Sequence, residues 1–304
     1  YLLFNFFCNY FKNISKKYKT VQALQNITFE VQEGELFGLI GPDGAGKTTL
    51  FRLLTTLLIP NEGSATVANY DIVKQVKEIR NSVGYMPGKF SLYQDLTIAE
   101  NLAFFATIFG TTIEENYDLI EDIYVQIEPF KNRRAGALSG GMKQKLALCC
   151  ALIHKPKVLF LDEPTTGVDP VSRKEFWEML KRLKQKGITI LVSTPYMDEA
   201  SLCDRIALIQ KGKILKIDSP DAIVKAYEKT IYEVATNQMH NLILDLKEFP
   251  SQYSVFAFGE FMHYIDKNDT FETETLRAYL HEKGHQYISI QKATPTIEDV
   301  FMDL

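Results

Sequence analysis

The chain has 304 residues, of which 46% are hydrophobic, and its 34 Lys and Arg against 38 Asp and Glu leave a net charge of −4. A chain of this size and composition can bury a large core, and we expect one sizeable domain plus a small one. The near balance of charge excludes a whole-chain attraction to nucleic acid, and no stretch reaches the roughly 20 apolar residues that a membrane helix needs.

The N-terminal segment, residues 1–12, is strongly apolar but lacks a basic leader and a small-residue cleavage site, so it makes a poor signal peptide. We assign it no role beyond that of a possible extra edge strand. Residues 13–31 then carry two strand-like runs around residues 20–25. Tyr18 lies at this turn, where it could stack on a nucleotide base or be an ordinary surface tyrosine.

Residues 35–54 (ELFGLIGPDGAGKTTLFRLL) predict a buried strand, a glycine-rich turn and the start of a helix. Within them, residues 41–48 fit G-x-x-x-x-G-K-[ST], in which backbone N–H groups cradle phosphates, the lysine reaches the β and γ phosphates and the hydroxyl holds Mg²⁺. Glycine lets the main chain approach an anion, and the helix that starts near Lys47 points its positive end at the same place. The sequence therefore predicts a nucleoside triphosphate site.

The next segments predict helices that are not separated by strands. Apolar spacing indicates an amphipathic helix over residues 71–82, followed by a short buried strand at 83–86. Capping boxes at Thr97 and Thr112 begin helices that extend to residue 109 and to about residue 127. Two successive helices break the β–α rhythm and predict a helical subdomain, about residues 90–155, inserted in the nucleotide domain.

Two further segments carry candidate chemistry. Ser139 caps a predicted helix over residues 140–154, and the two glycines that follow it form a second place where phosphate could sit. Residues 158–161 predict a strand that is buried on both faces and delivers Asp162 and Glu163 at its C-terminal end, where open parallel sheets bind ligands.

The segments from Asp169 onward complete the nucleotide domain and then form a second, smaller unit. Asp169 caps a helix that extends to residue 186, and a buried strand, a short helix and a hairpin around Gly212 follow it at 188–192, 197–203 and 206–217. After residue 220 the pattern changes to an α+β alternation without a phosphate loop. The expected elements are strands at 231–236, 253–264 and 286–291 and helices at 239–247, 274–283 and from Thr296. We place the boundary near residues 227–230.

The four cysteines, Cys8, Cys149, Cys150 and Cys203, form no C-x-x-C pair and have no histidine nearby at metal spacing. We therefore expect buried free thiols and no zinc site.

Four runs in this order, GPDGAGKTT (41–49), LSGGMKQK (138–145), VLFLDEP (158–164) and GVDP (167–170), resemble the nucleotide-binding subunit of an ABC transporter. The ending PTIEDVF (295–301) is similar to the C-terminal extension of the drug-resistance and type-2 exporter branch. The resemblance implies an α/β fold: a P-loop NTPase domain over residues 13–228, with a mixed sheet and the inserted helical subdomain, and a small α+β domain over 229–304.

The resemblance also implies ATP and Mg²⁺ as cofactors and a role for each matching position. Glu163 would be the general base that polarises the attacking water, which suits a reaction that needs positioned charge and an oriented nucleophile. Asp169 would lie in a dimer seam. The implied metal ligands are Thr48 and Asp162, and the implied nucleotide contacts are Tyr18 with the adenine, Gly41, Asp43, Gly44, Ala45, Gly46, Lys47, Thr48 and Thr49 with the phosphates, and Ser139, Gly140 and Gly141 with the γ-phosphate held by a facing subunit.

The implied function is ATP hydrolysis that powers a transporter through ATP-driven closure of two nucleotide domains. The resemblance favours export over import. The implied partners are membrane-spanning permease subunits and a second nucleotide-binding domain, identical or different, with no nucleic acid. The implied location is the cytoplasmic face of a bacterial cell membrane. In the family the permease contacts residues 88–102, where Phe90, Leu92 and Tyr93 are either exposed anchors or packing of the subdomain.

Two positions depart from the family. Gly88 stands where a glutamine is expected and Pro195 where a histidine is expected, so neither supplies a polar side chain to the terminal phosphate. One alternative is therefore an ATP-gated switch subunit with a slow, degenerate site in a heteromeric transporter. Another is an ABC-type ATPase that acts on DNA or ribosomes without transport, although the long insertions and basic linkers of those classes are missing.

Overall fold

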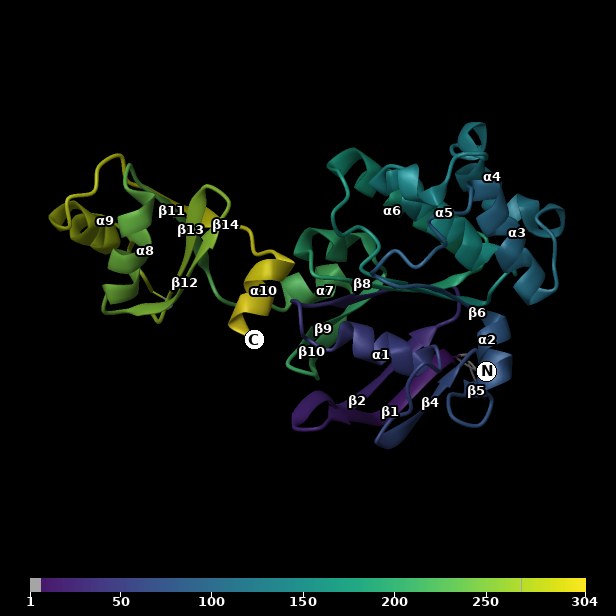
Figure 1. Ribbon diagram of the computed structural model, residues 1–304. Coiled ribbons are helices and arrows are strands. Elements are labelled where there is room, and N and C mark those ends of the chain that lie inside the picture. Colours follow the sequence, from purple (N-terminus) through teal and green to yellow (C-terminus); the bar gives the residue numbers. More distant parts are fainter. Residues whose placement is uncertain (1–6, 269) are drawn as a thin grey trace. The chain divides into compact units, whose positions relative to one another are not determined.

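The computed structural model describes residues 7–268 and 270–304, so the first half of the unassigned N-terminal segment, residues 1–6, lies outside the described residues. The chain divides into two compact units (Figure 1). The first ends at Pro220 and the second spans Asp221–Leu304.

A six-stranded sheet forms the centre of the first unit, in the order β10-β9-β3-β8-β7-β6. Five strands are parallel, namely β3 (Leu36–Ile40), β6 (Val83–Met86), β7 (Val158–Asp162), β8 (Thr189–Thr194) and β9 (Arg205–Gln210), and β10 (Lys213–Asp218) is antiparallel to β9. The β9–β10 turn has positive φ at both Lys211 and Gly212, as a tight hairpin requires. β3, β7 and β8 are buried along their whole length, which explains their unbroken apolar runs.

The N-terminal strands form a separate antiparallel sheet in the order β2-β1-β4-β5. Its strands are β1 (Phe7–Tyr18), β2 (Val21–Gln32), β4 (Glu62–Val67) and β5 (Tyr70–Asp71). β1 lies between β2 and β4, so the expectation of an extra edge strand is wrong for the described part of that segment. The neighbour that sequence reasoning missed is β4, which comes after the phosphate loop.

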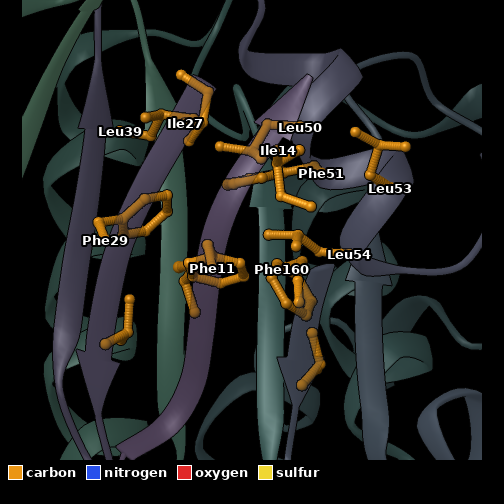
Figure 2. Packing of buried hydrophobic residues seen from close by; sticks show 14 of the residues in the cluster. Phe11, Ile14, Ile27, Phe29, Leu39, Leu50, Phe51, Leu53, Leu54 and Phe160 are labelled. Carbon is orange, nitrogen blue, oxygen red and sulfur yellow. The ribbon is translucent and has the colours of Figure 1, made fainter. Parts of the chain in front are cut away.

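Helix α1 (Lys47–Leu54) packs between the two sheets. Its Phe51 meets Phe160 of β7 edge to face, with ring centroids 5.6 Å apart, while Phe11 and Ile14 of β1 close the same cluster from the other sheet (Figure 2). All four side chains are fully buried. This packing fixes the N-terminus of α1 at the C-terminal end of β3.

The helical subdomain contains α3 (Ile98–Phe109), α4 (Tyr117–Tyr124) and α5 (Gly140–Leu152), with short 3-10 turns η1 (Glu114–Asn116), η2 (Glu128–Phe130) and η3 (Ala135–Ala137). The capping box at Thr97 is confirmed, and Gly110 ends α3 in the left-handed conformation. The helix predicted from Thr112 begins instead as a 3-10 turn and is α-helical only in α4. The side chain of Asn116 donates to the Ile153 carbonyl at 2.8 Å, which ties this first turn to the end of α5.

Helix α2 (Val76–Ser82) starts later than the predicted residue 71. The Asp71 carboxylate accepts from the backbone N–H groups of Val73 and Lys74 at 2.9 and 2.8 Å. Such a turn competes with helix for the same backbone groups, so the helix begins only after it. Farther along, α6 (Pro170–Gln185) follows the Asp169 cap as predicted, and the short helix before β9 is the 3-10 segment η4 (Met197–Leu202).

In the second unit a helix follows the first strand and another follows the third. After α7 (Pro220–Lys225), the elements are β11 (Ile231–Ala235), α8 (Met239–Glu248), β12 (Gln252–Phe258), β13 (Phe261–Asp266), α9 (Thr273–Glu282), β14 (Ser289–Ala293) and α10 (Ile297–Asp303). The order β12-β13-β11-β14, antiparallel throughout, is the ferredoxin-like arrangement. The single run predicted at 253–264 is a hairpin, because Gly259 adopts a positive φ and turns the chain.

Cys149, Cys150 and Cys203 are free and buried, as predicted. Across residues 7–268 and 270–304 no group of three or more His, Cys, Asp and Glu side chains is placed to hold a metal ion. In the same residues no helix has both the length and the hydrophobicity needed to cross a bilayer.

Candidate nucleotide site

The glycine-rich loop between β3 and α1 needs glycine at particular positions. A Cβ on Gly41 would lie 2.0 Å from the Ile209 carbonyl oxygen, and one on Gly46 would lie 2.6 Å from that of Ala23. Gly46 also has a φ of +109° and Gly44 a φ of +78°. The loop therefore leads tightly from the strand into the helix, while Asp43 and Gly44 remain exposed at its tip.

Lys47 joins this loop to the end of β7. Its ammonium donates to the carbonyl oxygens of Gly41 and Pro42 at 2.7 and 3.0 Å. It also forms an ion pair with Glu163, with 3.1 Å between Nζ and Oε1. The Lys47 side chain is only 3% exposed. The negative charge of Glu163 offsets part of the free-energy cost of burying the Lys47 ammonium.

Asp162 and Glu163 are both held by Ser193, the neighbouring residue on β8. The Ser193 hydroxyl donates to Asp162 Oδ1 at 2.7 Å, and Glu163 N–H donates to the Ser193 hydroxyl and carbonyl oxygens at 3.1 and 3.0 Å. Glu163 has a φ of +51°, an unusual conformation for a residue with a side chain. Sequence reasoning gave Ser193 no role, although its place at the end of a buried parallel strand was the available signal.

The second predicted phosphate site lies at the N-terminus of α5. Ser139 and Gly140 are exposed and Gly141 is half-buried. The Ser139 hydroxyl accepts from Met142 N–H at 3.4 Å, as a helix cap. Among the described residues no hydrogen bond or ion pair joins Ser139–Gly141 to residues 41–49. α5 does reach the loop after β7, because the Gln144 amide donates to the Pro164 carbonyl.

Of the remaining predicted contacts, Asp169 and Tyr18 are exposed and Thr48 and Thr49 are half-buried. Asp169 caps α6 by accepting from Ser172 N–H at 3.0 Å, and this hydrogen bond lowers the pKa of the Asp169 carboxyl. Tyr18 is 40% exposed at the end of β1, with Lys16 Nζ 5.7 Å from the centre of its ring. Thr48 and Thr49 are half-buried in the first turn of α1.

The two departures from the family pattern lie beside these groups. A Cβ on Gly88 would lie 3.0 Å from the Asp162 carbonyl oxygen and 3.8 Å from Glu163 Cβ, so position 88 faces the two carboxylate residues without offering a side chain. Pro195 directly follows Thr194, whose carbonyl accepts from Gly41 N–H at 3.3 Å.

The residues predicted to anchor a membrane partner are placed differently from one another. Leu92 is buried, Tyr93 is 50% exposed, and Phe90 is half-buried with Lys143 Nζ 5.6 Å from its ring centre. Leu92 lines an apolar groove of about 470 Å³ together with residues of α3, α5 and β6.

Comparison with known proteins gives the family. The ABC transporter family model matches residues 24–166. A probable multidrug ABC transporter ATP-binding protein of Escherichia coli is 40% identical over 93% of this chain and 49% of its own length. A Nod factor export ATP-binding protein I of Burkholderia lata is 33% identical over 97% of this chain and 95% of its own length. The chain belongs to the ABC transporter ATP-binding family.

Solved structures agree with this assignment. The chain aligns with cbiO1 from Clostridium perfringens, part of an ABC transporter complex, at a TM-score of 0.65 and 26% identity over 72% of this chain and 91% of that one. It aligns with a dimeric ATP-binding cassette in a post-hydrolysis state bound to ADP and Pi at a TM-score of 0.63 and 26% identity, over 69% and 98% of the two chains. The predicted family and the P-loop fold are confirmed. The chain spans about half the length of the Escherichia coli relative.

Proposed function

We propose that this ABC subunit hydrolyses ATP to power an exporter, at sites that two nucleotide-binding chains share. The observation that carries the proposal is the meeting of Lys47 and Glu163 at 3.1 Å while Ser139 and Gly140 lie exposed at a separate helix N-terminus. The names of two relatives, one a multidrug transporter protein and the other an export protein, support export.

The phosphates bind to the backbone N–H groups of residues 41–49 and to Lys47. Once a phosphate competes for the Lys47 ammonium, the Glu163 carboxylate is released from its ion pair. It then orients the attacking water and accepts its proton, which is general base catalysis. Ser193 holds Glu163 in place for this step through the hydrogen bonds to its backbone N–H.

The residues at this edge also fit Mg²⁺. Thr48 and Asp162 offer hydroxyl and carboxylate oxygens, which are the hard ligands that Mg²⁺ prefers. Mg²⁺ bound there would neutralise charge on the phosphates. Since Asp162 Oδ1 accepts from Ser193, the orientation of its carboxylate is set before any ion binds.

The facing chain, a copy or a relative, supplies Ser139, Gly140 and Gly141 to the γ-phosphate. An exposed helix N-terminus with a serine cap offers N–H donors and a positive dipole end to an anion. Asp169 lies in the seam between the chains, and Tyr18 stacks on the adenine. In this proposal residues 13–228 form the nucleotide domain and residues 229–304 an accessory domain.

A membrane permease docks at the apolar groove lined by Leu92, and Tyr93, the next residue in the chain, is 50% exposed. The groove has a volume of about 470 Å³, and hydrophobic grooves are one kind of surface on which an amphipathic helix of a partner can lie. This docking keeps the subunit at the cytoplasmic face of a bacterial membrane.

The test of this function is ATP hydrolysis by the purified chain and by Glu163→Gln, together with the oligomeric state in ATP. We expect the parent to release phosphate and Glu163→Gln to accumulate as an ATP-bound dimer. A chain that binds ATP but never dimerises or hydrolyses it, also with its permease present, would contradict the proposal.

A second candidate is a slow site that holds the dimer closed while a partner's site turns over. Gly88 favours it, because the position beside Asp162 and Glu163 lacks a side chain, and so does Pro195. The intact Glu163 opposes it.

A further inference from the structure

A buried carboxylate that the proposed mechanism does not use lies beside the nucleotide site. Glu199 of η4 is 2% exposed. Its Oε2 accepts from the hydroxyls of Thr194 and Thr165 at 2.6 and 3.1 Å. Its Oε1 accepts from Arg173 Nε and Nη2 at 3.1 and 2.9 Å. One side chain therefore joins three separate segments of the chain.

Two of these segments continue directly into the nucleotide site, and the third is the start of α6. Thr165 follows Glu163 in the loop after β7, and Thr194 ends β8. Through its carbonyl, Thr194 also accepts from the first glycine of the phosphate loop, Gly41, at 3.3 Å. Arg173 lies one turn into α6, where its N–H donates to the Asp169 carbonyl at 2.9 Å.

The network also fixes the segment that contains Pro195. Proline has no N–H to donate, so the backbone there depends on its neighbours. The Thr194 hydroxyl donates to Glu199 and accepts from Tyr196 N–H at 3.1 Å, and the Tyr196 ring lies 4.4 Å from the Arg173 guanidinium. Glu199 thus holds the chain on both sides of a position that lacks the family histidine.

Burying a charge is unfavourable unless it is paired and hydrogen-bonded, and an apolar side chain could fill the same space at similar stability. What an apolar side chain could not do is hold two hydroxyls and a guanidinium at fixed positions at once. Asp198 shows the contrast, because it pairs with the same Arg173 at 3.3 Å but is 75% exposed. Its loss leaves no buried group unpaired.

We propose that Glu199 is a positioning residue for ATP hydrolysis. It fixes the positions of three segments relative to the phosphate loop. These are the loop that carries Glu163, the start of α6 with Asp169 and the end of β8. It acts on turnover and leaves ATP affinity nearly unchanged, since none of its hydrogen bonds involves a predicted phosphate contact. This inference rests on the proposed roles of Glu163 and Asp169.

The test compares kcat and KM for ATP in the full chain and in Glu199→Gln, which keeps the shape of the side chain and removes its charge. We expect kcat to fall about 10- to 100-fold, the scale of a displaced catalytic group, with KM changed less than about threefold. The matched control Asp198→Asn removes the exposed partner of the same arginine and should stay within about twofold of the parent.

Two further variants distinguish an error in the positioning role of Glu199 from an error in the proposed function. Thr165→Val deletes one donor to Glu199 without changing size, and we expect kcat to fall about threefold to tenfold. Glu163→Gln tests the proposed function in the same assay: if it hydrolyses ATP like the parent, that function fails. If Glu163→Gln is inactive but Glu199→Gln keeps kcat within about twofold, only the positioning role is wrong.

An equal loss of ATP binding and turnover in Glu199→Gln, measured with a fluorescent nucleotide analogue, would show that Glu199 only maintains the fold there and would overturn the proposal. If Glu199→Gln does not fold, Thr165→Val decides: unchanged kcat overturns the proposal and a selective fall in kcat supports it.

Discussion

The N-termini of helices α1 and α5 are both preceded or begun by glycines, but they have different surroundings. At α1, parallel strands bring Glu163 and Ser193 to the loop, and Lys47 is buried among them. At α5, Ser139 caps its own helix and stays exposed with Gly140. Glycines and a helix dipole thus make a complete anion site only where other elements supply charge, and we infer that the exposed N-terminus is completed by another chain.

The largest effect should come from Glu163→Gln, which keeps the shape at the α1 site and removes the proposed base. We expect turnover to fall about 100- to 10,000-fold, the usual range for general base catalysis, with ATP binding retained. Phosphate release and equilibrium nucleotide binding measure the two effects. The control is Glu175→Gln, whose carboxylate pairs with Lys145 but is 50% exposed. Turnover within about tenfold of the parent would mean that Glu163 is not the base.

Lys47→Ala removes the buried cation of the α1 site. We expect kcat/KM to fall about 100- to 1,000-fold, as when a preorganised electrostatic contact is deleted, and ATP binding to weaken as well. Lys181→Ala, an exposed lysine on α6 paired with Glu178, serves as the control in the same titration. Unchanged ATP affinity together with unchanged turnover would remove the basis for calling the α1 region the stronger site.

Ser139→Arg places a bulky side chain at the exposed α5 terminus. Because Ser139 has no hydrogen bond with residues 41–49, ATP binding to a single chain should stay the same, while turnover should fall about 10- to 100-fold through failure to close. The control Thr112→Arg alters another exposed cap, which accepts from Glu115 N–H at 3.2 Å. A weakened single-chain affinity would show that both termini serve one chain's own site.

Introducing the glutamine and the histidine that the family has at positions 88 and 195 tests whether the α1 site lacks side chains that hydrolysis needs. We expect the double variant Gly88→Gln, Pro195→His to raise steady-state turnover about twofold to tenfold, since a side chain at position 88 faces Asp162 and Glu163. Pro195→His alone should give part of the gain. If neither variant exceeds the parent with the transport partner present, these loops have drifted without consequence and the slow-site alternative fails.

Sequence reasoning predicted most of the nucleotide domain because its signals are local. The Thr97 capping box, the buried run of β7 and the Asp169 cap each depend on residues close together in the chain, and all were found. It missed features that depend on distant pairing. β4 pairs with β1 although the phosphate loop lies between them in the sequence. Glu199 meets Thr165 and Arg173 only in the folded chain.

The site itself was predicted less evenly than the fold. The structure brings Lys47 and Glu163 together, which spacing alone could not establish, and adds Ser193 as the link between Glu163 and Asp162. It leaves Ser139 and Tyr18 on exposed turns, where their roles depend on a second chain or a bound nucleotide. Residues that act across an interface give no signal in the contacts of one chain.

The most direct test of a nucleotide site that two chains share is complementation between two inactive variants. Lys47→Ala keeps the Ser139 terminus, and Ser139→Arg keeps the phosphate loop, so a mixed dimer contains one intact site and one with both defects. We predict that mixing the two purified variants restores ATP hydrolysis to about a quarter of the parent rate, because half of the dimers are mixed and each has one site. If the mixture hydrolyses no faster than the mean of its components, the α1 loop and the α5 terminus are not two halves of one nucleotide site in dimers of this chain.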